Sequence, residues 1–399
     1  VKACIREVAE NSGADIQIVE IGGTVGDMEV MIYVEAIRQM RWICESLRDC
    51  CYLHVTLMPF IATAGELKTK PIQNSVKVLR SMGIQPDVII CRTEKNMTTE
   101  AKDKVALFCN VKAQNVIQNL ESDGFYEIPI SLEKQGLAKI VLDELELEDR
   151  RADLDDWTAM LARKAAATET VYVALVGAYP DSVNAYLSVM EALHHAGMAE
   201  GMLVDITTIS SEDLDEETSG QMLTAFDAFV LPGGYESRGA EGVMIAAKYA
   251  RENRIPMLAI GLGMQLTIVE IAQDLLGLHS ANSTEIDPET PDPIVYLPEG
   301  RSLNGTKAPA LRIGGKDIRF YEGKIKNAYG SETARERHAN GYEINPDYIG
   351  KLENAGLKMT AVSEEGGFAE AFELEGHPFY CLAIYHPEYI SRPNRPHPL

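Results

Sequence analysis

Short apolar runs alternate with longer amphipathic stretches through the second half of the chain. An apolar run that is followed by a helical pattern and bounded by glycine or proline is typical of a strand leading into a helix. Repeated alternation of this kind predicts a parallel sheet covered by helices. The expected strands lie at residues 171–177, 202–206 and 228–234, and the expected helices lie at residues 181–196 and in the segment ending at residue 251.

The first part of the chain has a similar pattern. A helical segment opens the chain, residues 15–21 (DIQIVEI) have the pattern of a buried strand, and the glycine-rich segment GGTVGDME follows at residues 22–29. Glycines after a strand can form a simple turn, or they can present bare backbone N–H groups to an anion. Acids at the edge of such a loop can hold Mg²⁺ or a sugar hydroxyl.

One turn has the form of a nucleophile elbow. Residues 256–270 (PMLAIGLGMQLTIVE) form an apolar run, two close glycines and an amphipathic helix. At the apex of such an elbow a serine or cysteine is held in a strained backbone, and the next N–H is available to an oxyanion. The apex here is Gly261, which fits the turn because it lacks a Cβ but which carries no reactive atom. From this stretch alone, an ordinary strand-to-helix turn is the alternative.

The chain is long enough for more than one domain. Its 399 residues, 46% of them hydrophobic, predict two or three domains. Residues 143–156 hold eight acids and lead into an alanine-rich stretch, which predicts a partly helical linker. We therefore place one domain at residues 1–142, a linker at 143–168 and a second domain at 169–399. In the second domain, the proline-rich residues 287–309 predict a surface loop, and residues 358–386 predict further strands.

Composition narrows the choice of partners. No apolar run approaches the roughly 18 residues that span a bilayer, and no signal peptide opens the chain, so we expect a cytoplasmic protein without a membrane partner. A net charge of -23 argues against a nucleic-acid partner, because phosphate backbones are bound by an excess of lysine and arginine. The seven cysteines show no CxxC spacing, which predicts reduced and mostly buried thiols.

Charge is reversed locally at residues 68–80, which hold four cations and no acid. Such a stretch can focus the phosphates of a nucleotide. The alternative is a solvated helix face.

Three segments resemble class I glutamine amidotransferases. The family elbow LGICLGMQ is here LAIGLGMQ, the segment VLPGGYESR at residues 230–238 resembles the oxyanion loop, and YHPEY at residues 385–389 resembles the His-Pro-Glu motif. The three segments follow one another in the family's order.

This resemblance assigns roles to individual residues. It implies that His386 is the base, that Glu388 orients it, that Gly234 and the N–H of Leu262 bind the oxyanion, and that Gln265 and Glu285 contact glutamine. The family cysteine is replaced by Gly261. The family's ERHRHRYE is here ERHANGYE, so Gly341 replaces the arginine that holds the glutamine carboxylate. Glu236 and Ala178 also depart from the family's glycine and lysine. We therefore expect a glutaminase site that has decayed.

The first part resembles a more specific family. The string EIGGTVGDME at residues 20–29 is similar to the EIGGTVGDIE signature of CTP synthases. The similarity continues through VEAIRQM, GELKTKPIQNSVK, IQPDVIICR, KVALFCNV and IPISL, so that the two resemblances together cover nearly the whole chain.

The second resemblance implies the nucleotide sites. Lysines supply point charges for a triphosphate, an amide can bind a base or sugar, and a carboxylate is a hard ligand for Mg²⁺. The implied UTP and CTP contacts are Asp27, Met28, Glu29, Lys68, Thr69, Lys70, Gln73 and Lys104; the implied ATP contacts are Leu120, Glu121 and Ser122; and the implied Mg²⁺ ligand is Glu20. Where residues 120–122 stand, the family commonly has Lys-Asp-Val.

The expected fold is α/β with two parallel-sheet domains. One is a P-loop NTPase-like (Rossmann-like) synthase domain and the other a flavodoxin-like class I glutamine amidotransferase domain. No GxxxxGK[ST] motif occurs in the sequence, and the family carries it well before the EIGGTVGDIE string, so we expect a fragment cut at both ends.

The implied function is ATP-dependent amination of UTP to CTP, with Mg²⁺ as cofactor, CTP as feedback inhibitor and GTP as a candidate effector. Ammonia is the expected nitrogen source in place of glutamine, and a homotetramer is the expected assembly. One alternative is a non-catalytic paralogue that binds nucleotide or co-assembles with an active enzyme. Another is a lone amidotransferase or γ-glutamyl hydrolase, which requires the missing thiol and leaves residues 1–135 unexplained.

Overall fold

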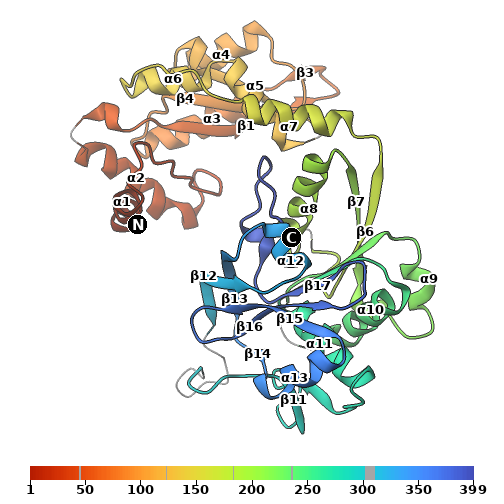
Figure 1. Ribbon diagram of the computed structural model, residues 1–399. Coiled ribbons are helices and arrows are strands. Elements are labelled where there is room, and N and C mark those ends of the chain that lie inside the picture. Colours follow the sequence, from red (N-terminus) through yellow and green to blue (C-terminus); the bar gives the residue numbers. More distant parts are fainter. Residues whose placement is uncertain (45, 123, 183, 235–236, 302–310) are drawn as a thin grey trace. The chain divides into compact units, whose positions relative to one another are not determined.

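The computed structural model describes all residues except 45, 123, 183, 235–236 and 302–310. The chain divides into two compact units, Val1–Thr158 and Ala159–Leu399, coloured red to yellow and green to blue in Figure 1. In the part of the chain that the structure describes, no helix is both long and apolar enough to cross a bilayer.

Unit 1 is built on a three-stranded parallel sheet. Its strands β1 (Leu53–Leu57), β4 (Val88–Thr93) and β5 (Val116–Leu120) lie in the order β1-β4-β5. The central strand β4 is almost entirely buried, because neighbours cover both of its edges and helices cover its faces. The other strands are the short hairpin β2 (Phe60–Ile61) and β3 (Glu66–Leu67), and the helices are α1 (Lys2–Ser12), α2 (Met31–Ile43), α3 (Lys70–Ser81), α4 (Thr99–Cys109), α5 (Ile128–Lys134) and α6 (Leu137–Glu144). Helix α7 (Asp155–Ala166) contains the boundary between the two units.

Local sequence explains where two of these helices begin and end. Helix α3 starts with Pro71 in its first turn, where a missing N–H carries no penalty. Helix α4 is capped by Thr98, whose hydroxyl accepts from the N–H of Ala101 at 3.1 Å. It ends at Asn110 in the left-handed conformation.

The strand expected at residues 15–21 is wrong. These residues form no strand, and Ile16, Ile18 and Val19 are 48%, 92% and 44% exposed. A strand requires a neighbour for its backbone groups, and none of the described strands pairs with this segment. The apolar pattern was therefore insufficient evidence for a strand.

Unit 2 contains a nine-stranded sheet of order β13-β12-β15-β16-β17-β9-β8-β6-β7. The five strands from β17 to β7 are parallel, and the strands from β16 to β13 extend the sheet in antiparallel fashion. These strands are β6 (Thr170–Gly177), β7 (Leu203–Ser210), β8 (Ala228–Leu231), β9 (Met257–Ile260), β12 (Arg312–Phe320), β13 (Thr333–Asn340), β15 (Leu357–Ser363), β16 (Ala369–Leu374) and β17 (Tyr380–Ala383). The mixed α/β architecture with parallel sheets confirms the predicted fold class.

Helices and a small second sheet complete unit 2. The helices are α8 (Leu187–Glu200), α9 (Ser219–Leu223), α10 (Ala240–Asn253), α11 (Leu262–Asp274), α12 (Lys324–Tyr329) and α13 (Pro346–Asn354), and the small sheet contains β10 (Ala281–Ser283), β11 (Asp292–Tyr296) and β14 (Glu343–Ile344).

Two boundaries in unit 2 differ from the prediction. Helix α8 starts at Leu187, later than residue 181. Before it, the N–H of Ser182 donates to the carbonyl of Tyr179, and the N–H of Tyr179 donates to the hydroxyl of Tyr186 at 3.2 Å, so these residues form a turn. The proline-rich stretch is also not only a loop. Its strand β11 buries Ile294 and Val295 completely, because β10 and β14 flank it.

The core of unit 2 is centred on α11. Ten of its thirteen residues are buried, so the helix packs on all sides, unlike an amphipathic surface helix. Beneath its N-terminus, Gly263 lies so close to β8 that an added Cβ meets the carbonyl oxygen of Leu231.

The cysteines differ from expectation in burial. All seven are free thiols, but only Cys91, Cys109 and Cys381 are buried. The expectation that most are buried is therefore wrong. The remaining four are Cys4, Cys44, Cys50 and Cys51.

We expect Gly263→Ala to lower the free energy of unfolding of unit 2 by about 1–3 kcal/mol, the scale of overpacking in a filled core. The new methyl group lies 2.3 Å from the Leu231 oxygen, so strand or helix must shift. Pulse proteolysis in urea measures the loss. Gly220→Ala is the control, because its Cβ meets nothing nearer than 3.9 Å. Equal stability of the two variants contradicts the packing described here.

Candidate functional site

Gly261 forms the apex of the predicted elbow. It joins β9 to α11 with φ 55° and ψ -116°, a conformation that residues with a Cβ rarely adopt. Its N–H donates to the carbonyl of Ala383 at the end of β17, at 2.8 Å. The strained turn is therefore present and is fixed by the neighbouring strand.

The space above Gly261 faces the predicted base. An added Cβ lies 3.4 Å from Cε1 and Nε2 of His386 and 3.4 Å from Cα of Gly233, which is ordinary van der Waals contact. A side chain at this position therefore points at the imidazole. The arrangement is that of a nucleophile beside its base, with the nucleophile removed.

His386 and Glu388 form a buried pair. Nδ1 of His386 lies 2.8 Å from Oε1 of Glu388, and both residues are 9% exposed. A proton on Nδ1 that is donated to this carboxylate leaves Nε2 as the acceptor facing Gly261. The His386 ring also stacks on Tyr389 with centroids 4.8 Å apart, and the backbone N–H of His386 donates to the carbonyl of Arg337 at 2.8 Å. These contacts fix the ring in the orientation that a base requires.

The Gly-Gly segment lies against the same pair. A Cβ on Gly233 lies 2.7 Å from Cε1 of His386, so only glycine permits this approach. A Cβ on Gly234 lies 3.4 Å from the side chain of Leu262. Leu262 is the first residue of α11, where the first N–H groups of a helix have no partner within it. The predicted oxyanion residues are thus brought together at one helix N-terminus.

The predicted glutamine contacts cluster around Tyr342. The amide of Gln265 donates to the carbonyl of Tyr342 at 3.2 Å. Burial raises the pKa of Tyr342, and the charge of Glu285 raises it further, so Glu285 lies nearby. Gly341 directly precedes Tyr342 and is buried. Glu236, another departure from the family pattern, lies outside the described residues.

A guanidinium from another segment, that of Arg301, lies beside Gly341 and is already paired. Nη1 of Arg301 lies 3.5 Å from the carbonyl oxygen of Gly341 and 2.7 Å from Oε1 of Glu343. Glu343 is completely buried and also contacts Arg312 at 3.1 Å. These arginines therefore compensate a buried carboxylate.

The glycine-rich loop of unit 1 is exposed and rests on α3. Val25 packs with Val34, Leu79 and Ile84, and an added Cβ on Gly26 lies 3.4 Å from Val78. The predicted nucleotide and metal residues of this loop remain solvent-accessible; they are Glu20, Asp27, Met28 and Glu29.

Two of the predicted lysines lie beside one carboxylate. Lys68 forms an ion pair with Glu66, and this contact lowers the pKa of Glu66. The charge of Lys104 lowers that pKa further, so Lys104 lies close to the same group although it comes from α4. The third predicted lysine, Lys70, is exposed at the start of α3. Cations that are far apart in the sequence, Lys68 and Lys104, thus meet beside Glu66.

Gln73 and Thr69 complete this group of residues. The Gln73 amide donates to the Thr69 hydroxyl at 3.1 Å, across one turn of α3. Thr69 is buried, whereas Gln73 is half-buried. The bond fixes the amide at the N-terminal end of α3.

The predicted ATP contacts lie at the carboxyl end of β5. Leu120 is the last residue of that strand, and the N–H of Glu121 donates to the carbonyl of Thr93 at the end of β4, at 2.8 Å. Ser122 donates its hydroxyl proton to the carbonyl of Gly124 at 2.7 Å. Ligands of open α/β sheets bind at this edge, so the position suits a nucleotide.

Sequence reasoning missed Tyr342 and Tyr389. Tyr389 belongs to the quoted YHPEY segment, three residues after His386, a spacing that could have suggested the ring contact. The role of Tyr342 depends on its carbonyl, for which the sequence carries no signal.

Comparison with known proteins first defines the class of unit 2. Residues 182–399 match the class-I glutamine amidotransferase family, in agreement with the elbow, the His-Glu pair and the Gly-Gly segment. The chain is similar to the glutaminase domain of the Trypanosoma brucei CTP synthase, solved with bound acivicin, with a TM-score of 0.54 and 30% identity over 57% of this chain and 90% of that one.

Unit 1 then identifies the particular family. Residues 1–147 match the CTP synthase N-terminus. All of this chain aligns with the CTP synthases of Moorella thermoacetica (46% identical, 74% of its length) and Symbiobacterium thermophilum (44% identical, 75% of its length). The chain belongs to the CTP synthase family.

We expect the thiol in Gly261→Cys to have a pKa below the ordinary value of about 8.5, because it faces the imidazole of His386. Alkylation by iodoacetamide as a function of pH, read at residue 261 by mass spectrometry, measures the pKa. The variant should also lose about 1–3 kcal/mol of stability, since φ is 55°. Adding His386→Ala should return the pKa to the ordinary value. An identical profile with and without the imidazole contradicts the geometry.

Proposed function

We propose that the protein converts UTP to CTP with ATP and takes the amino group from free ammonia, not from glutamine. The observation that carries this proposal is the pairing of an intact elbow and an intact His386–Glu388 pair with a glycine at the nucleophile position. In the proposed reaction, ATP phosphorylates the 4-oxygen of UTP and ammonia displaces the phosphate. Unit 2 contributes no covalent step.

No other thiol can replace the missing nucleophile. Cys381 is the nearest in sequence, but it lies inside β17, is completely buried and has its pKa raised to about 12 by burial. A protonated thiol without access to substrate is inert. His386 by itself has no group to activate for covalent attack.

Glutamine recognition is lost as well. Gly341 supplies no charge for an α-carboxylate, and Arg301 beside it is engaged by the buried Glu343. Moving Arg301 to a ligand leaves Glu343 with one cationic partner fewer, which is costly in a buried site. Two independent functions are therefore missing from one pocket, and this favours natural decay over a single replacement.

The lysine cluster and the exposed loop suit the nucleotide substrates. We assign UTP and CTP to Asp27, Met28, Glu29 and the cluster formed by Lys68, Lys70 and Lys104. The lysines supply positive charge for the phosphates, and the loop residues are exposed to solvent. Residues 120–122 are assigned to ATP. CTP as inhibitor, GTP as effector and the homotetramer are part of the same proposal and come from the family resemblance.

Glu20 is assigned to Mg²⁺ that arrives with the nucleotide. Among the described residues, no three acids, histidines or cysteines come together as a ready-made metal site. Mg²⁺ is commonly held by one or two carboxylates together with substrate phosphates and water, so one exposed carboxylate fits this mode. When bound, the ion neutralises phosphate charge.

We expect the full-length gene product to make CTP with ammonium and to release no glutamate from glutamine. Loss of a triad nucleophile costs a factor on the order of a million in turnover. Gly261→Cys alone should stay inactive, because Gly341 supplies no carboxylate partner. Gly261→Cys combined with Gly341→Arg should release measurable glutamate. The assay compares these three proteins for glutamate and CTP.

Each outcome of this assay is informative. Substantial glutamate release by the parent contradicts the interpretation of Gly261. Full recovery in the single Gly261→Cys variant shows that the loss at Gly341 has no consequence. If no CTP is formed with either ammonium or glutamine, the non-catalytic paralogue is favoured.

We expect Lys70→Ala to weaken UTP or CTP binding by about 1–3 kcal/mol, the scale of a charge-assisted hydrogen bond. Isothermal calorimetry on the full-length protein measures the loss. Lys77→Ala is the matched control, because Lys77 is also exposed on α3 but lies outside the predicted contacts. Equal nucleotide affinities of the two variants would show that Lys70 does not contact the nucleotide.

A further inference from the structure

Two thiols of unit 1 lie almost in contact. Sγ of Cys44 is 3.5 Å from Sγ of Cys50, and both residues are half-buried. A disulfide has an S–S length of about 2.05 Å, so the sulfurs need to approach by roughly 1.5 Å. Small rotations of the two side chains can provide this movement.

The backbone on either side holds the pair in place. The N–H of Cys44 closes the last turn of α2 by donating to the carbonyl of Met40 at 3.1 Å. Before Cys50, Ser46 and Asp49 form a capping box: the Ser46 N–H donates to the Asp49 carboxylate at 2.9 Å, and the Ser46 hydroxyl accepts from the Arg48 N–H at 3.1 Å. The proximity of the sulfurs is therefore built into the fold of this segment.

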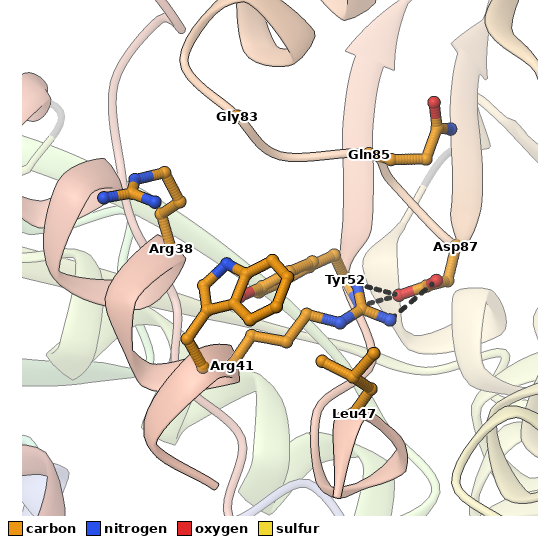
Figure 2. A pocket seen from close by; sticks show the side chains of 8 residues that line it. Arg38, Arg41, Leu47, Tyr52, Gly83, Gln85 and Asp87 are labelled. Carbon is orange, nitrogen blue, oxygen red and sulfur yellow. Dashed lines mark hydrogen bonds and ion pairs between the residues drawn. The ribbon is translucent and has the colours of Figure 1, made fainter.

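The pair adjoins an open pocket of about 270 Å³, drawn in Figure 2. Leu47, which lines it, belongs to the turn between the two cysteines, and Trp42 lines it two residues before Cys44. Figure 2 shows Arg41 reaching toward Asp87 and Tyr52, with the guanidinium 3.3 Å from the carboxylate and 4.8 Å from the ring centroid. Two residues that line this pocket, Trp42 and Leu47, are thus close in sequence to the two cysteines.

We propose that Cys44 and Cys50 are a modification site that forms a reversible disulfide when a peroxide is the oxidant. With hydrogen peroxide, one thiolate attacks a peroxide oxygen and the O–O bond breaks; this gives a sulfenic acid and hydroxide, which takes a proton from solvent to become water. The second thiol then attacks that sulfur, forms the S–S bond and releases a second molecule of water. The two sulfurs lose two electrons in total and the peroxide gains them. A dithiol reductant reverses the change by exchange.

The environment predicts a slow reaction at neutral pH. Burial and the neighbouring thiol raise the pKa of Cys50 to about 11, so little of it is thiolate. The rate should therefore rise as the pH increases. Burial likewise raises the pKa of Cys51 to about 12, and no second sulfur lies within hydrogen-bond distance of Cys51 in the described chain.

Other thiols provide internal comparisons. Burial and the neighbouring Cys109 raise the pKa of Cys91, but both residues are completely buried, which protects them from a dissolved oxidant. Cys4 is exposed but lies on α1 without a neighbouring thiol. The half-buried pair alone combines proximity with access in the part of the chain that the structure describes.

The disulfide would link Cys44, directly after α2, to Cys50, three residues before β1. It fixes the segment holding Leu47 against the helix that carries Trp42. Because Trp42 is 71% exposed and two residues from Cys44, its fluorescence should change on oxidation. The only other tryptophan is Trp157, so Trp42→Phe assigns the signal.

The test treats the chain with hydrogen peroxide at pH 7 and pH 9 and counts thiols under denaturing conditions. We expect a loss of two of the seven thiols, a mass lower by about 2 Da and full reversal by dithiothreitol. Trypsin cuts after Arg41, Arg48 and Lys68, so the disulfide links peptide 42–48 to peptide 49–68. Mass spectrometry without reductant detects this linked pair.

Variants separate the outcomes. The linked peptides should persist in Cys51→Ser and be absent from Cys44→Ser and Cys50→Ser, with alanine at either position as a second version if serine disturbs folding. Circular dichroism confirms that each variant is folded. Linkage that is lost in Cys51→Ser but retained in Cys50→Ser assigns the bond to Cys51 and overturns the proposal. Oxidation that adds oxygen to separate cysteines without linking peptides also overturns it.

Discussion

The positive φ angle at Gly261 is the constraint on which the rest of unit 2 depends. It turns the chain from a buried strand into a buried helix within one residue, and the bond from its N–H to Ala383 ties that turn to the neighbouring strand. This strand, β17, leads directly to His386. The same hydrogen bond therefore sets the distance between the elbow and the base. Glycine adopts this geometry without strain, whereas a cysteine here would hold a strained backbone.

The persistence of the His386–Glu388 pair follows from packing as well as chemistry. The imidazole stacks on Tyr389, and its backbone is held by Arg337. Its edge is so close to Gly233 that neither residue can change freely. A buried histidine beside a buried carboxylate is also difficult to replace one partner at a time, because the remaining group loses its hydrogen bond. The geometry of the His386–Glu388 pair therefore depends on its own packing and hydrogen bond, and not on the residue at position 261.

Most of unit 2 could be predicted from the sequence, because the alternation of strands and helices and the glycines at the turns between them are local signals. The elbow and the strands on both sides of it lie where expected, and the mixed α/β class is confirmed. The strand at residues 15–21 failed because an apolar run does not say whether a partner strand exists. The contact between Gln265 and the carbonyl of Tyr342 was also out of reach, since it is a backbone contact across 77 residues. The roles of the individual site residues stay predictions.

The cations of the two units differ in whether they are available to a ligand. In unit 1, Lys68 and Lys104 come from separate elements and lie beside the exposed carboxylate of Glu66, so a phosphate can compete for them in water. In unit 2, Arg301 and Arg312 are committed to the completely buried Glu343, where the pairing cannot be released cheaply. A guanidinium that compensates a buried acid is unavailable to a ligand. Arg301 and Arg312 are therefore not free to take the place of the arginine that the family has at the position of Gly341. The proposed losses of glutamine binding and of covalent chemistry have separate physical causes, one at Gly341 and one at Gly261.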